Sequence, residues 1–135
     1  MPEQNVEIVR GVIEAWNRRD FETLMSFGAD DIELRLVGGF ADMIGDTFDG
    51  PDAVLRFWRE MAETIGGRID FEDARDLDDG TRLLVRFTWT GSGVESGAPA
   101  VMKTGQIWTF RDGKAIRMQS YWERPDALEA AGLSE

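Results

Sequence analysis

The chain has 135 residues, which is enough for one domain with a single core and too few for two ordinary domains. Hydrophobic residues make up 42% of it, and no apolar run approaches the roughly 20 residues of a membrane span, so we expect no membrane partner. Its 15 basic and 26 acidic residues give a formal charge of −11, and an acidic surface repels phosphate backbones, so we expect no nucleic acid partner.

Cysteine and histidine are both absent from the sequence. Their absence excludes disulfides and thiolate nucleophiles and removes the usual zinc ligands, so we expect no metal and no cofactor. Without histidine, acid–base chemistry near neutral pH would depend on carboxylates. The first residues lack the basic and apolar regions of a signal peptide, which leads us to expect a cytoplasmic location.

The first third of the chain predicts two helices and a strand. Apolar residues recur at spacings of three and four over residues 5–19, which is the pattern of an amphipathic helix. Asp20 can cap a short second helix over residues 21–27, because its side chain can accept from a backbone N–H of the first turn. Alternation of apolar and polar residues then predicts a strand over residues 32–37.

A long loop is predicted over residues 38–50, and loops of this length in a compact domain are often functional. It holds the large apolar residues Phe40 and Met43 and the carboxylates Asp42 and Asp46. A carboxylate desolvated among apolar side chains becomes a stronger base. Asp42 and Asp46 are therefore candidate general bases, if the loop folds over a pocket.

The rest of the chain predicts one more long helix, four strands and a short last helix. Gly50-Pro51 opens the long helix, which runs to about residue 65, because proline is favoured at the first helical position. The strands are expected over residues 68–77, 81–90, 101–110 and 115–123, and the last helix over residues 125–131. Helices followed by antiparallel strands predict a single α+β domain over residues 1–135, with a curved antiparallel sheet wrapped around three helices.

The last two strands form the most informative unit, because the turn Asp112-Gly113 between them is a strong hairpin signal. Alternation assigns one face of this hairpin to a mixture of large apolar and polar side chains. These residues are Met102, Thr104, Gln106, Trp108, Phe110, Ile116, Met118, Ser120 and Trp122. A buried glutamine needs partners that a ligand or water can supply, so the face fits a pocket wall better than a filled core.

The order of these elements, with several short segments, resembles the SnoaL-like family of the nuclear transport factor 2-like and ketosteroid isomerase-like superfamily. The segments are residues 16–20 (WNRRD), 48–51 (FDGP), 107–114 (IWTFRDGK) and the tail 126–133. The resemblance implies a cone-shaped domain. It also implies a small, mostly apolar ligand, and a homodimer formed through the outer sheet face.

The comparison with ketosteroid isomerases implies specific roles for Trp122 and Gln106, and it implies that two of the isomerases' catalytic residues are missing here. Trp122 matches a pocket tryptophan, and Gln106 falls where the isomerases place a protonated aspartic acid that stabilises an oxyanion. A glutamine amide can donate to a carbonyl or enolate oxygen, but it cannot exchange protons usefully near neutral pH. The catalytic base and the oxyanion tyrosine would align near Leu36 and Val12, so isomerisation by that machinery should be absent.

The candidate catalytic residues are therefore Asp42 and Asp46 as base and Gln106 as electrophilic stabiliser. The candidate ligand-binding residues are Trp16, Phe40, Met43, Trp58, Phe87, Trp89, Gln106, Trp108, Met118, Ser120 and Trp122. The expected chemistry is isomerisation, cyclisation, or hydration or hydrolysis of a polyketide-like or terpenoid-like carbonyl or hydroxyl compound.

Two alternatives remain open. The protein could be a non-catalytic module that binds a ligand, or an accessory dimerisation domain whose interior is filled by its own side chains. For the outer face of the hairpin, with Ile107, Thr109, Gln119 and Tyr121, the resemblance implies the two-fold contact, and Tyr121 is expected to be an interface or surface group.

Overall fold

The computed structural model describes residues 2–37, 47–64, 66–77, 81–92, 99–121 and 124–132. Its helices are α1 (Pro2–Arg18), α2 (Phe21–Ser26), α4 (Pro51–Thr64) and α5 (Arg124–Ala130). Its strands are β1 (Gly28–Val37), β2 (Thr47–Asp49), β3 (Arg68–Asp76), β4 (Arg82–Ser92), β5 (Pro99–Arg111) and β6 (Lys114–Tyr121). Within these ranges, no helix is long and apolar enough to cross a membrane.

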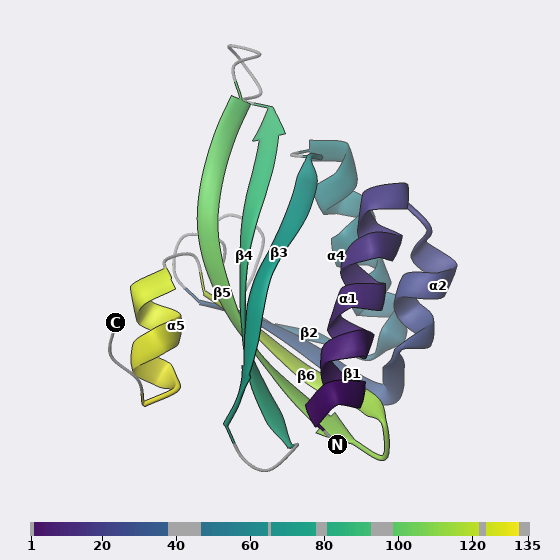
Figure 1. Cartoon of the computed structure of the whole chain (residues 1–135). Helices are drawn as coiled ribbons and strands as arrows, with labels where there is room; N and C mark the ends of the chain where they lie inside the picture. Colours follow the sequence, from purple (N-terminus) through teal and green to yellow (C-terminus); the bar gives the residue numbers. More distant parts are fainter. Residues whose placement is uncertain are drawn as a thin grey trace.

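The strands form one six-stranded sheet in the order β2-β1-β6-β5-β4-β3. The predicted four-strand antiparallel meander is confirmed from β3 to β6, and β1 extends it by pairing parallel to β6. The sheet is long and curved, with α1, α2 and α4 against one face and α5 against the other (Figure 1). The α+β prediction with three helices inside the curve of the sheet is therefore confirmed.

The inner core forms between these three helices and the sheet because each long helix has one apolar stripe. On α1 the buried residues Val9, Val12 and Trp16 follow spacings of three and four, and on α4 the buried residues Val54 and Trp58 are four apart. Burial of apolar surface is favourable by about 25 cal/mol per Å², so these stripes stabilise the packing of the helices on the sheet.

Two predicted boundaries in the first half were wrong. The first strand begins at Gly28, four residues before the predicted start, with a register shift against β6 before Glu33. Strand β2 lies inside the stretch predicted as a loop and pairs antiparallel with β1. Three residues are too few to show the alternation that predicts a strand.

The β5–β6 hairpin has the predicted turn, in which Asp112 and Gly113 both have positive φ, of 52° and 75°. The register between the strands shifts beside the turn, at Phe110. Ala115 lies opposite Phe110 and is buried in the inner core, whereas Ile116 lies at the register shift and is only half-buried. The assignment of Ile116 to the inner face was therefore wrong, because one extra residue moves the following side chain to the other face.

Helix α5 covers the middle of the outer sheet face. Ala127 and Leu128 of α5 form a second core with Leu84, Ile107 and Tyr121 of the sheet. Tyr121 is only 8% exposed, and this burial raises the pKa of its hydroxyl above the ordinary value. The expectation that Tyr121 is a surface or interface group was wrong, because the chain's own last helix covers it.

Arg124 fixes the start of α5 to the sheet. Its guanidinium donates to the backbone oxygens of Phe87 (3.0 Å) and Thr104 (3.4 Å), and it forms an ion pair with Glu72. Glu72 lies where the register of β3 shifts against β4. The Arg124 guanidinium holds the pKa of Glu72 below its ordinary value, and Thr88 adds a hydrogen bond of 2.8 Å to the same carboxylate.

The segment WNRRD closes α1 by contacts that explain its composition. The Asn17 side chain both donates to and accepts from the backbone of Ile69, at 2.9 Å each, and so pairs with the edge strand β3. Arg19, at φ 59°, lies over the Trp16 ring and donates to the Gly67 oxygen at 2.8 Å. Asp20 caps α2 as predicted, with its carboxylate accepting from the Thr23 backbone.

Candidate ligand-binding site

A small apolar cavity lies in the inner core, between the helices and the β5–β6 hairpin. The residues that line it are Val12, Leu24, Met25, Phe27, Gly28, Ile32, Val54, Trp58, Trp108, Ala115 and Met118. The centre of a water molecule can occupy about 10 Å³ of it. This is space for roughly one water, whereas pockets for drug-sized ligands measure about 300–1,000 Å³.

Three tryptophans pack against one another in the interior. The Trp16 ring lies 5.4 Å from the Trp58 ring and 5.5 Å from the Trp89 ring, centroid to centroid. The Trp89 indole donates to the Gly66 oxygen at 2.8 Å, so its polar group has a partner. The Nε1 atoms of Trp16 and Trp58 are buried without an acceptor among the residues that the structure describes. A buried donor without a partner costs about 1–3 kcal/mol, which makes these two indoles exceptional.

A chain of hydrogen bonds joins three side chains of the hairpin. Trp108 Nε1 donates to Gln106 Oε1 at 2.7 Å, and Gln106 Nε2 donates to Ser120 Oγ at 3.2 Å. The register places Gln106 directly opposite Ser120, and Trp108 opposite Met118 in the next row. We call these three side chains the Trp108–Gln106–Ser120 relay.

The direction of this relay is fixed by chemistry. An indole nitrogen can only donate, so the amide oxygen of Gln106 must face Trp108 and its NH₂ must face Ser120. Ser120 therefore accepts, and its own hydroxyl hydrogen has no acceptor among the described residues. The predicted pair Gln106 and Ser120 is thus brought together, with Ser120 at the free end.

The described interior offers hydrogen-bond donors but no acid or base. Its buried polar side chains are Asn5, Thr104, Gln106 and Ser120. Val12 lines the cavity, and Leu36 is buried beside Ser120 on the neighbouring strand. The two positions that align with the isomerases' base and tyrosine therefore lie in the folded interior as aliphatic side chains. Among the described residues, no carboxylate takes the place of the missing base.

Eight of the predicted ligand-binding residues are buried on the inner side. They are Trp16, Trp58, Phe87, Trp89, Gln106, Trp108, Met118 and Ser120. Three of them, Trp58, Trp108 and Met118, line the cavity itself. Phe40, Asp42, Met43, Asp46 and Trp122 lie outside the described residues, so their roles stay predictions.

Sequence reasoning missed several wall residues, including Met25, Phe27 and Ala115. Met25 and Phe27 belong to the short helix and its end, where six residues give too little periodicity to identify an inner side. Ala115 lies opposite the buried Phe110, and it was missed because alternation counted back from Met118 and Ser120 crosses the register shift.

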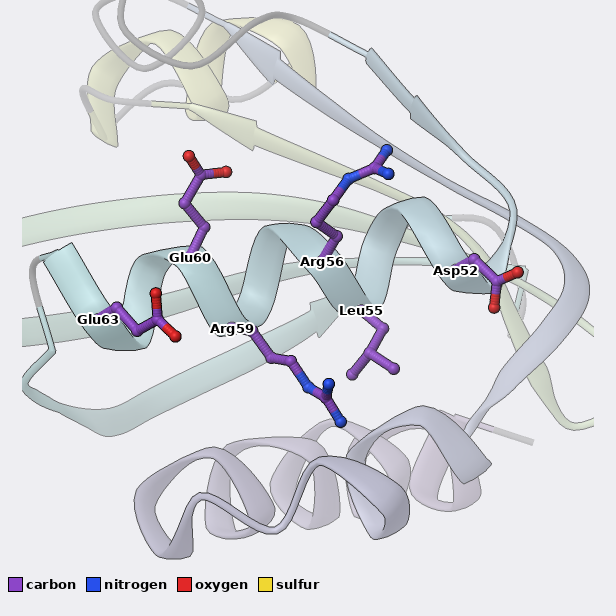
Figure 2. A pocket seen from close by; sticks show the side chains of 6 residues that line it. All are labelled: Asp52, Leu55, Arg56, Arg59, Glu60 and Glu63. Carbon is purple, nitrogen blue, oxygen red and sulfur yellow. The ribbon is translucent and has the colours of Figure 1, made fainter.

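A second hollow, of about 490 Å³, is an open groove along α4. Figure 2 shows Arg56 and Glu60 on one side of the helix, and Leu55 and Arg59 on the side that faces α2. Charges of opposite sign at spacings of four are typical of a solvated helix face. This groove is therefore a poor site for an apolar ligand. In the described part of the chain, including this groove, no three His, Cys, Asp or Glu side chains are grouped to hold a metal.

Comparison with known proteins gives a family and a fold. The sequence model of the SnoaL-like domain matches residues 9–118. A search of curated proteins finds no match.

Three solved structures are similar over most of their length. TerC, co-crystallized with polyporic acid, is 25% identical, with a TM-score of 0.78 over 89% of this chain and 92% of TerC. An NTF2-like protein of unknown function from Burkholderia pseudomallei is 26% identical, with a TM-score of 0.78 over 96% of each chain. A Mycobacterium tuberculosis protein in complex with estradiol-17beta-hemisuccinate is 14% identical, with a TM-score of 0.76 over 89% of this chain and 94% of that one. The chain thus belongs to the SnoaL-like domain family and has the fold of the nuclear transport factor 2-like superfamily.

Proposed function

We propose that the protein binds a small, mostly apolar molecule inside the cone. The observation that carries this proposal is the apolar cavity walled by Trp58, Trp108 and Met118 in the middle of the inner core. Small-molecule sites are usually apolar cavities with a few placed polar groups. The co-crystallization of the relative TerC with polyporic acid supports a ligand in this fold.

The cavity must enlarge before a ligand can enter, because it holds about one water. Two of its wall residues are Met25 and Met118. Methionine is unbranched and has three rotatable bonds, so it can move aside at a lower cost than a β-branched or aromatic side chain. We therefore expect the ligand to displace these two side chains while the tryptophans stay in place.

The proposed ligand class is a polyketide-like or terpenoid-like compound with a carbonyl or hydroxyl group. Gln106 and Ser120 would orient that group, since they are the polar side chains next to the cavity wall on the hairpin. An isomerase, cyclase, hydratase or hydrolase activity would in addition need Asp42 or Asp46 as base. Asp42→Asn and Asp46→Asn variants that keep full turnover of such a compound would exclude that role.

Filling the cavity provides the test of binding. Ala115 lines it and is 2% exposed, so Ala115→Leu should occupy the ligand's place. Ala74→Leu is the matched control, because Ala74 packs on the inner core from β3 but does not line the cavity. A panel of apolar carbonyl compounds should change the tryptophan fluorescence of the wild type and of Ala74→Leu, and much less that of Ala115→Leu. Equal responses in all three proteins would contradict binding in this cavity.

The small cavity volume favours a second candidate, the accessory dimerisation domain. In that case the interior is filled by its own side chains and no compound of the panel binds. The uncovered part of the outer sheet face, around Gln119, would then form the contact, since α5 occupies the middle of that face. Sedimentation at micromolar concentration distinguishes the mass of a monomer from that of a homodimer, and a monomer mass would contradict this candidate.

A further inference from the structure

The interior contains three donors that lack an acceptor among the described residues. Two are the indole N–H groups of Trp16 and Trp58, which are 0% and 4% exposed. The third is the hydroxyl hydrogen of Ser120, which remains because the relay makes Ser120 accept from Gln106. No buried side-chain acceptor in the described residues lacks a partner. The imbalance is therefore entirely on the donor side.

The three donors lie at or near one interior space, the small apolar cavity. Trp58 lines the cavity from α4. The centroid of the Trp16 ring lies 5.4 Å from the centroid of the Trp58 ring. Ser120 follows the cavity-lining Met118 by two residues on the same face of β6, which is about 7 Å along a strand. A ligand that displaces Met118 would thus lie between a donor on the helix side and a donor on the sheet side.

From this imbalance we infer that the cone selects ligands by their hydrogen-bond acceptors, so that it takes apolar molecules with carbonyl oxygens. The inference rests on the proposed function and names the chemistry that the site prefers. A carbonyl oxygen accepts from Trp58 or Ser120 and leaves no polar hydrogen of its own to satisfy. A ligand hydroxyl brings a further donor into an interior that already has donors to spare, and a hydrocarbon satisfies none of them.

The matched compounds indanone, indanol and indane test this preference, because they share one bicyclic frame. A purely apolar cavity ranks them by hydrophobicity, with indane first. The donor-rich cone is expected to reverse that order, with indanone bound about tenfold more tightly than indane and indanol in between. Calorimetric titration of the wild-type chain measures the three dissociation constants.

Two variants assign the preference to the named donors. Trp58→Phe keeps an aromatic ring without the N–H, and Ser120→Ala removes the hydroxyl. Each should reduce the ratio of indanone to indane affinity severalfold, and the ratio cancels changes in packing that affect both compounds. Thr109→Val is the control, because it removes a hydroxyl from the outer face of β5 and should leave the ratio unchanged. Circular dichroism checks that each variant is folded. If Trp58→Phe does not fold, Ser120→Ala alone tests the assignment of the preference to these donors.

The outcomes separate this inference from the proposed function. If none of the three compounds binds, both fail. If indane binds at least as tightly as indanone, ligand binding stands and the selection by acceptors is overturned. A preference for indanone that survives both variants overturns the assignment to Trp58 and Ser120. A preference that falls in either variant but not in Thr109→Val supports it.

Discussion

Gly105 of β5 lies directly beneath Ala127 of α5, so close that a Cβ at position 105 would come within 2.6 Å of the Ala127 Cβ. Real Cβ atoms do not approach at this distance, so α5 can lie on the sheet only because position 105 has no side chain. This contact determines how the outer core closes over Ile107 and Tyr121.

Gly105→Ala should lower the free energy of unfolding by about 1–3 kcal/mol, because α5 must shift away from the sheet. Chemical denaturation measures the loss, and hydrogen exchange should show faster exchange at Ile107 and Tyr121 than in the wild type. Ala127→Gly in the same chain restores the space. The double variant should therefore be about 1 kcal/mol more stable than the sum of the single changes predicts, and strict additivity would contradict the contact.

Arg124→Met should lower stability by about 1–3 kcal/mol and loosen the start of α5. The side chain is 15% exposed and donates to two backbone oxygens of the sheet, and its loss leaves these acceptors and Glu72 without their charged partner. Arg111→Met is the control, since Arg111 forms an exposed ion pair with Asp31 whose loss should cost less than about 1 kcal/mol. Similar losses in denaturation of the two variants would show that Arg124 is only a surface residue.

The same ion pair predicts an acid-sensitive attachment of α5. Because Arg124 holds the pKa of Glu72 below its ordinary value, the folded state binds the Glu72 proton more weakly than the unfolded chain does. The resulting stability is present above the unfolded pKa, about 4.3, and is lost as the pH falls through the lower folded pKa. In Glu72→Gln the dependence of unfolding on pH in this range should be weaker than in the wild type, and identical curves would exclude Glu72 as a contributor.

Much of the inner face could be predicted from the sequence, because it depends on local patterns. Alternation along β5 and along β6 is enough to place Gln106 and Ser120 on one face of the hairpin. The same reasoning failed at Ile116, where a one-residue register shift beside the turn reverses the faces. Such a shift depends on strand twist and neighbouring contacts that a single strand's pattern does not contain.

The outer face was harder to predict, because its burial depends on a contact between distant segments. Tyr121 alternates as an outward residue, and only the docking of α5 buries it. One signal was available, since a glycine inside a strand, here Gly105, often marks the close approach of another segment. The cavity volume has no sequence signal at all, because it depends on how Met118 and its neighbours fill the interior.

Gln106→Leu should lower the free energy of unfolding by about 1–3 kcal/mol, because it leaves the Trp108 N–H buried without an acceptor. Trp108→Phe alone removes the donor and leaves the Gln106 oxygen unpaired. The double variant removes both polar ends, so it should be more stable than the sum of the single losses predicts. Denaturant titration of the four proteins gives the coupling energy. A coupling near zero would mean that Trp108 does not hold Gln106 in place, and the direction of the relay toward Ser120 would then be lost.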